Sequence, residues 1–144
     1  MRVMQILRSK PEGDVVTIQP GSKVSEAAQL LSEKRIGAVI VSHDGGTVIG
    51  ILSERDIVRE LGRRGAGCLD DPIEAIMTAN PVGCSKEEDS DEVFQKMTDG
   101  RFRHLPVLED GKMIGLISIG DVVKCRLSEL AMEKTALEGM IMGH

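Results

Sequence analysis

The chain has 144 residues, 18 basic and 23 acidic side chains, a formal net charge of −5 at pH 7, and two aromatic residues, Phe94 and Phe102. This composition argues against a duplex nucleic-acid surface, which needs a clustered basic face, and against single-strand binding by base stacking. The length indicates one compact domain, whose core must consist of Ile, Val, Leu, Met and Ala side chains.

The cysteines and the N-terminal residues indicate in which cellular compartment the protein is expected. Cys68, Cys84 and Cys125 are scattered, with no CxxC or Cys/His spacing, which predicts reduced thiols and neither a zinc site nor a disulfide framework. The first residues reach Arg8 and Lys10 without the apolar run of a signal peptide, and no apolar run is long enough to span a bilayer. We therefore expect a cytoplasmic protein without a membrane segment.

The first half of the chain predicts a short series of strands and helices, read from apolar periodicity and from Gly, Pro and Ser positions. In chain order these are a helical turn at 3–8, a loop at 9–14 that contains Gly13, a strand at 15–19, a helix capped by Ser22 or Ser25 that ends near Arg35, strands at 38–42 and 48–52 around a turn at 44–46, and a helix from 54 to about 62.

The second half predicts the same order again. Its elements are a helical turn at 73–77, a strand at 80–85, a helix at 89–99 with Val93, Phe94 and Met97 facing inward, strands at 104–108 and 113–117, and a helix from 119. The predicted organisation is a first repeat at 3–63, a linker at 64–72, a second repeat at 73–130 and a helical tail at 131–144.

One stretch occurs twice and organises the chain, at residues 48–59 and 113–124. Each copy predicts a buried strand that ends at a serine, followed by a helix with an aspartate three residues after that serine. An internal repeat fixes the architecture before any site is considered. The sequence therefore predicts an α/β (α+β) fold of two pseudo-symmetric β-α-β-β-α repeats that share one core, plus a C-terminal helical extension.

The last helix is longer than its counterpart in the first repeat. Charged residues interrupt its apolar positions, which are Val122, Cys125, Leu130, Met132, Leu137, Met140, Ile141 and Met142. A single-domain core does not need such an amphipathic, methionine-rich extension, so we expect it to bury itself against a second chain or to fold back.

These motifs, in this order, resemble a tandem pair of cystathionine-β-synthase-type domains, the CBS pair or Bateman module. Residues 76–78 and 80–82 resemble the start of a repeat, residues 104–107 before Asp110 resemble its second strand, and residues 35–41 and 53–58 are similar to those of small stand-alone members. The resemblance covers about residues 3 to 130. It implies a non-catalytic regulatory module that binds adenosine-containing ligands between its repeats and commonly forms a disc-like homodimer.

Two roles are open for the repeated serine and aspartate. Each Ser-x-x-Asp pair matches a helix capping box, which would make it purely structural. The resemblance implies instead that Asp56 and Asp121 accept hydrogen bonds from the two ribose hydroxyls, while Ser53 and Ser118 approach a phosphate. A carboxylate suits two adjacent hydroxyls, and a helix N-terminus favours phosphate, so the ligand role agrees with the chemistry.

The resemblance also suggests which residues surround each ligand. The site at Asp121 would hold adenine and phosphate with Val16, Ile36, Gly37, Arg103, His104 and Ser118. The site at Asp56 would use Val82, Phe102, Arg103, Ala38 and Ser53. Ordinary core packing is the alternative for the apolar members. Because Arg103 and His104 are basic, while Glu54 lies beside the serine of the first motif, the sequence predicts the tighter nucleotide site at Asp121.

Three kinds of function are compared with these features. The first is a sensor that binds AMP, ADP, ATP or a dinucleotide such as NAD, with no catalytic cofactor, and acts on a partner protein. The second is an assembly module whose clefts are vestigial. An enzyme is not expected, because the sequence offers no Ser/His/Asp set, no metal-ligand cluster and no P-loop.

Overall fold

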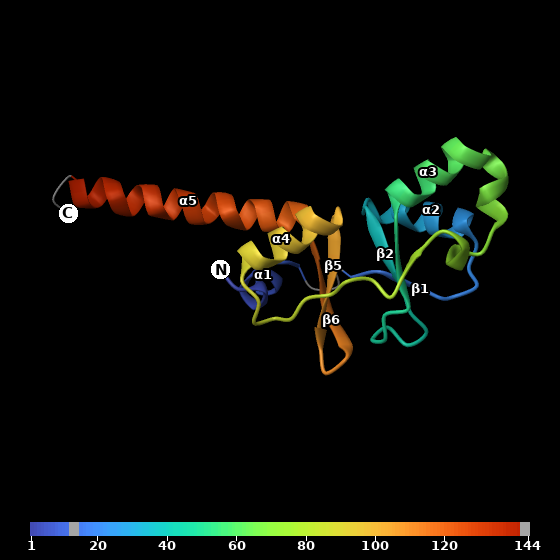
Figure 1. Cartoon of the computed structure of the whole chain (residues 1–144), viewed down its shortest axis with the longest axis horizontal. Helices are drawn as coiled ribbons and strands as arrows, with labels where there is room; N and C mark the ends of the chain where they lie inside the picture. Colours follow the sequence, from blue (N-terminus) through green and yellow to red (C-terminus); the bar gives the residue numbers. More distant parts are fainter. Residues whose placement is uncertain (12–14, 142–144) are drawn as a thin grey trace.

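The computed structural model describes residues 1–11 and 15–141, so the predictions that concern Gly13 and Met142 lie outside the described residues (Figure 1). The fold is mixed α/β, as predicted. In chain order its helices, 3₁₀-helices (η) and strands are α1 Val3–Arg8, β1 Thr17–Ile18, α2 Val24–Lys34, β2 Ala38–Val41, β3 Gly50–Ser53, α3 Glu54–Arg64, η1 Ala66–Asp70, η2 Ile73–Ala75, β4 Thr78–Ala79, α4 Ser90–Gly100, β5 His104–Glu109, β6 Lys112–Ser118 and α5 Ile119–Ile141.

The strands form two sheets, one per repeat. In the first sheet the order is β1-β2-β3-β4, with β1 parallel to β2 and the other pairs antiparallel. In the second, β5 and β6 form an antiparallel pair from His104 opposite Ser118 to Glu109 opposite Lys112. Strand β4 follows the linker in sequence, yet it pairs with β3 of the first repeat. Both halves of the chain therefore contribute strands to the first sheet.

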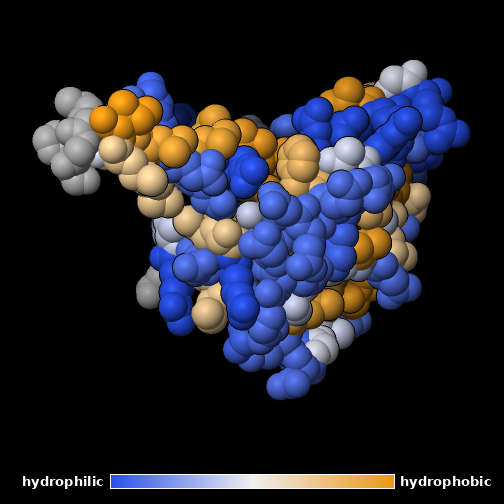
Figure 2. All heavy atoms as spheres, turned by 60° about the vertical axis from the view of Figure 1, so that its left-hand side comes forward, coloured by the Kyte–Doolittle hydropathy of each residue, from blue (hydrophilic) through white to orange (hydrophobic). Residues whose placement is uncertain are grey.

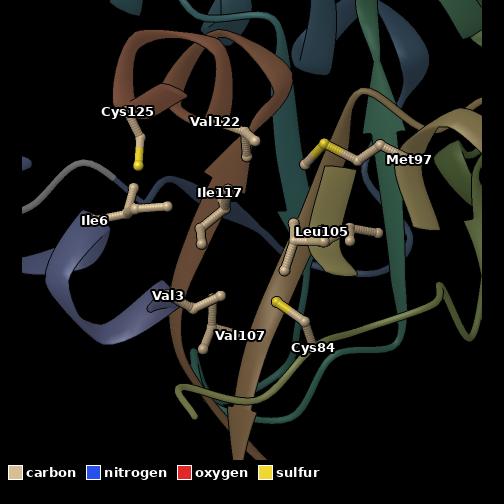
Figure 3. Close-up of a cluster of buried hydrophobic side chains, with 10 residues drawn as sticks. Val3, Ile6, Cys84, Met97, Leu105, Val107, Ile117, Val122 and Cys125 are labelled. Carbon is tan, nitrogen blue, oxygen red and sulfur yellow. The ribbon is translucent and has the colours of Figure 1, made fainter. Parts of the chain in front are cut away.

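The buried apolar residues form two clusters rather than the single shared core that the sequence predicts. One cluster joins α1, through Val3 and Ile6, to the second repeat (Figure 3). The other joins the first repeat to Ile73 and Ile76, which come after the linker. The two repeats therefore exchange segments: the segment at the start of each half packs into the hydrophobic core of the other half.

Two local predictions differ from the structure. The strand expected at 80–85 is reduced to a single parallel bridge between Cys84 and Val107, and it does not begin at residue 80, where Asn80 adopts a left-handed backbone (φ 48°) and Pro81 has no N–H to pair. Phe94 is 44% exposed, since Val93 and Met97 occupy the inward face of α4. The remaining elements lie within a few residues of the predicted bounds.

The C-terminal helix α5 projects away from the rest of the molecule (Figure 1). None of the helices in the described part of the chain combines the length and the apolar character needed to cross a bilayer. The three cysteines are free and buried.

Candidate functional site

The two strand-to-helix turns have nearly the same geometry. In the first, Asp56 Oδ2 accepts hydrogen bonds from the Ser53 N–H (2.9 Å) and hydroxyl (3.0 Å), and Ser53 Oγ accepts from the Asp56 N–H at 3.3 Å. In the second, Asp121 Oδ2 accepts from the Ser118 N–H at 2.9 Å, and Ser118 Oγ accepts from the Asp121 N–H at 3.1 Å. Both pairs are capping boxes, so the structural role is confirmed.

Capping uses the same oxygen of each carboxylate, Oδ2, and so does not exclude a ligand at the other oxygen. Asp56 Oδ1 accepts a hydrogen bond from Arg59 at 2.8 Å, and the Arg59 side chain is 58% exposed. Within the described residues no donor reaches Asp121 Oδ1. Asp121 Oδ1 is therefore available to a hydroxyl donor, whereas a ligand hydroxyl at Asp56 Oδ1 would share that oxygen with Arg59.

Asp56 faces a pocket of about 590 Å³, here called the Asp56 pocket. This volume lies within the range of ordinary small-molecule sites. Both repeats line the pocket, with Gly37, Ile51, Ser53, Glu54, Arg55, Asp56, Arg59, Thr78, Pro81, Val82, Gly100, Arg101, Phe102, Arg103, His104, Ser118 and Ile119.

Asp121 faces a smaller pocket of about 260 Å³, here called the Asp121 pocket. Its lining residues are Lys10, Ile36, Gly37, Ala38, His104, Leu116, Ser118 and Asp121. Three residues, Gly37, His104 and Ser118, border both pockets. Gly37 is close to His104, because a Cβ built on Gly37 would meet His104 Cε1 at 3.5 Å.

Most of the predicted site residues line the pocket to which the sequence assigns them. Ser53, Val82, Phe102 and Arg103 lie in the Asp56 pocket. Ile36, Gly37, His104 and Ser118 lie in the Asp121 pocket.

Two predicted site residues, Ala38 and Val16, do not line the pocket to which the sequence assigns them, and one of the two assignments of Arg103 also differs from the structure. Ala38 lines the Asp121 pocket instead of the Asp56 pocket. Val16 lines neither, because it packs against the core of the first repeat. Arg103, assigned to both sites, lines the Asp56 pocket only.

The arginines gather at the Asp56 pocket rather than at the Asp121 pocket. The lining of the Asp56 pocket includes four arginines and two acidic residues, which are Arg55, Arg59, Arg101, Arg103, Glu54 and Asp56. The Asp121 pocket holds one lysine and one aspartate. Compensation of phosphate charge is therefore available at the Asp56 pocket. The tighter site at Asp121 stays a prediction, which rests on His104 because Arg103 lines the other pocket.

Arg101 reaches the Asp56 pocket from a strained backbone position. It ends α4 in the left-handed conformation (φ 58°), and Arg35 ends α2 in the same way (φ 54°). Glycine is the usual residue at such a helix end, since a side chain there costs about 1–2 kcal/mol. Arg35 lies at the groove between α2 and α3. Of the two equivalent arginines, only Arg101 lines a pocket that contains a repeated aspartate.

The electrostatics of the Asp121 pocket depend on Lys10, which the sequence analysis does not identify. Its ammonium donates to Asp121 Oδ2 at 2.7 Å and to the Leu116 carbonyl at 2.7 Å. Burial raises the pKa of the Asp121 carboxyl, but hydrogen bonds from Lys10 and Ser118 lower it by more, so this pKa lies below its ordinary value. Burial, followed by the charge of Lys10, lowers the pKa of His104.

Lys10, Arg55 and Arg59 are the charged pocket residues that sequence reasoning did not assign to a ligand. Arg59 lies three residues after Asp56 in the repeated stretch, and this spacing on one helix could have indicated it. Lys10 lies in a loop far from Asp121 in sequence, and no local pattern marks it.

Comparison with known proteins adds three findings. The CBS domain family matches residues 3–63 and 73–128. A CBS-domain protein from Agrobacterium tumefaciens, ATU1752, is 44% identical, with a TM-score of 0.82 over 88% of this chain and 99% of that one. The chain also spans about a fifth of the length of curated relatives from Arabidopsis thaliana, one of which, CBSCBSPB5, is 31% identical over 86% of this chain and 22% of its own.

Two more distant structures were solved with ligands. The CBS domain protein PAE2072 from Pyrobaculum aerophilum, complexed with AMP, is 26% identical, with a TM-score of 0.76 over 92% of this chain and 99% of that one. The CBS domain pair of protein MJ0100, in complex with 5′-methylthioadenosine and S-adenosyl-L-methionine, is also 26% identical, with a TM-score of 0.76 over 90% and 98% of the two chains. With both repeats matched and the architecture shared, the chain belongs to the CBS domain family, as a tandem CBS pair.

Proposed function

We propose that this protein is a regulatory module that binds an adenosine-containing ligand in the pockets between its repeats and transmits occupancy to a partner protein. The observation that carries the proposal is the composition of the Asp56 pocket. The oriented carboxylate and the helix N-terminus come from the first repeat, and Val82, Phe102 and Arg103 come from the second. A ligand there would touch both repeats at once, so its binding could change their relative position.

The pocket offers a separate contact for each part of a nucleotide. In this proposal Asp56 accepts hydrogen bonds from the ribose hydroxyls, and Val82 and Phe102 supply apolar surface for a base. The arginines, together with the N-terminus of α3, compensate phosphate charge. Glu54 opposes phosphate, but the four arginines of the lining outnumber its two acidic residues. We therefore propose that the Asp56 pocket takes the phosphorylated ligand, with ATP, ADP, AMP and NAD as candidates.

The Asp121 pocket suits a smaller or less charged ligand. It has less than half the volume of the Asp56 pocket and a lysine already paired with its aspartate. The ligands of the two distant relatives, a nucleotide in one and an adenosine thioether and a sulfonium in the other, support the adenosine class in general. Unequal pockets predict unequal affinities for any one compound.

The alternative is an assembly module whose pockets are vestigial. Both aspartates cap helices, and Lys10 neutralises one of them, so each carboxylate has a structural use without a ligand. Under this alternative, adenine compounds would neither copurify with the protein nor stabilise it.

The test is a thermal-unfolding screen combined with native mass spectrometry. AMP, ATP, NAD, adenosine and GTP as the base control are added at millimolar concentration to the purified full chain. A ligand that binds only the folded state raises the melting temperature by mass action. We expect an increase with at least one adenine compound and a smaller one with GTP. Unchanged melting with every adenine compound would favour the assembly module.

A further inference from the structure

Helix α5 extends well beyond the domain to which it belongs. Its 23 residues correspond to about 35 Å of helix, and its buried side chains are those of Val122 and Cys125, near its start. Glu129 is held by the N-terminal amine at 3.1 Å. Over residues 130–141, no side chain is buried. A helical segment of this length is marginal in water unless one face packs against something.

The exposed side of α5 carries apolar residues at the spacing of a coiled coil. Positions 123, 127, 130, 134, 137 and 141 alternate steps of four and three, which averages the 3.5 residues that keep a seam on one side of a supercoiled helix. This α5 seam consists of Val123 (43% exposed), Leu127 (63%), Leu130 (47%), Lys134, Leu137 (59%) and Ile141 (85%). Figure 2 shows hydrophobic atoms along the projecting arm.

We propose that the α5 seam is covered by the α5 seam of a second copy of the chain, running antiparallel. A 3.5-residue repeat is specific for a helical partner, because neither a sheet nor a lipid surface requires it. The remaining question is the direction of the second helix, and the charged residues beside the seam decide it.

The residues that flank the α5 seam divide by charge along the helix. Lys124 and Arg126 flank its first half, and Glu133 and Glu138 flank its second half. A parallel pair would place like charges together, with Glu133 beside the partner's Glu138. An antiparallel pair places the basic half of each helix beside the acidic half of the other. Flanking charges of this kind set partner orientation in coiled coils.

Lys134, the one charged member of the seam, also favours the antiparallel orientation. In a parallel pair it would face the partner's Lys134 at the centre of the interface. In the antiparallel pair it lies opposite the partner's Leu130, where its aliphatic stem can pack while the ammonium reaches water. In this register Val123 is opposite the partner's Ile141, and Leu127 is opposite the partner's Leu137.

The first experiment measures the mass of the full chain by gel filtration with light scattering over a range of concentrations. We expect a dimer for the parent and at least a tenfold weaker dimer for Leu137→Lys. The control is Met132→Lys, which adds the same charge at a similarly exposed residue (57%) outside the seam. A monomeric parent, or equal loss of dimer in both variants, would overturn the proposal. Both residues are exposed, so neither substitution threatens folding.

The second experiment fixes the direction by oxidative cross-linking. The native thiols are buried, and burial raises the pKa of Cys84 to about 11, so introduced exposed thiols react first. In the antiparallel register, a double variant with Leu127→Cys and Leu137→Cys forms a covalent dimer, whereas either single variant does not. Efficient cross-linking of a single variant would indicate a parallel pair and contradict the proposal.

Discussion

The ammonium of Lys10 lies 2.7 Å from Oδ2 of Asp121, so the carboxylate of the second repeat already has a positive partner within the chain. The equivalent Asp56 is paired instead with Arg59, whose side chain is mostly exposed. The two repeats thus preserve the same turn but provide different charges around it. This difference is the basis for expecting two unlike sites.

Replacement of Lys10 by Met should lower the unfolding free energy at pH 7 by about 1–3 kcal/mol, the usual cost of losing a partly buried charged hydrogen bond. The low pKa of Asp121 contributes stability that is present above the unfolded Asp pKa of about 3.9 and is lost as the pH falls through the folded value. In Lys10→Met that pKa rises, so acid unfolding should begin at higher pH.

Urea unfolding from pH 3 to pH 7 measures both effects. Lys86→Met is the control, because Lys86 forms an ion pair with Glu109 at the surface, and such pairs contribute about 0–1 kcal/mol. Equal losses in the two variants would mean that the Lys10 pair has no special role in the pocket.

Arg101→Gly should increase stability while it weakens nucleotide binding. Glycine relieves the left-handed strain at the end of α4, for a gain of about 1 kcal/mol in unfolding free energy. The loss of one guanidinium from the Asp56 pocket should lower affinity for ATP several-fold and affinity for adenosine much less.

Arg35→Gly is the matched control for this prediction. It relieves the same strain at the end of α2 but removes no side chain from the Asp56 pocket. Urea unfolding and calorimetric titration of both variants separate the two effects. If Arg101→Gly binds ATP as tightly as Arg35→Gly does, Arg101 does not contact the phosphates.

The pKa of His104 should change when an anionic ligand binds. Burial and the charge of Lys10 lower its pKa, so its neutral form stabilises the fold. That stability is fully present above the unfolded His pKa of about 6.5 and is lost as the pH falls towards the lower folded value. A phosphate bound beside His104 favours the charged ring, so saturating ATP should raise the pKa of His104.

An NMR titration of the histidine ring signals tests this expectation, with His43 in the turn between β2 and β3 as an internal reference. His104→Gln should also lose less stability than the parent between pH 6.5 and pH 5. If the His104 pKa is the same with and without saturating ATP, the phosphates lie elsewhere.

The internal repeat made most of the fold predictable from the sequence. Gly50 and Gly115 occupy equivalent strand positions, and a Cβ on Gly50 would lie 2.9 Å from the Thr78 carbonyl, which explains why glycine is required there. The capping boxes were predicted because they depend on spacing within one strand and the helix after it, whereas the predicted pocket residues came from the family resemblance.

Features that depend on contacts between the repeats were missed. Strand β4 pairs with β3 across the linker, and Lys10 reaches Asp121 from a loop. Neither has a local periodic pattern, since only the packing of the two halves brings these segments together. The division of Ala38 and Arg103 between pockets follows from the same packing, which the alternation of strand residues does not specify.

Calorimetric titration of ATP into Asp56→Ala and Asp121→Ala shows whether Asp56 binds the ribose of a phosphorylated ligand. Both variants lose a capping carboxylate, so each should lose roughly 1 kcal/mol of stability. Charge-assisted hydrogen bonds contribute about 1.5–3 kcal/mol each, so Asp56→Ala should bind ATP at least tenfold more weakly, and Asp121→Ala should keep most of the parent affinity. Parent-like affinity in Asp56→Ala, with the expected loss of stability, would contradict the account.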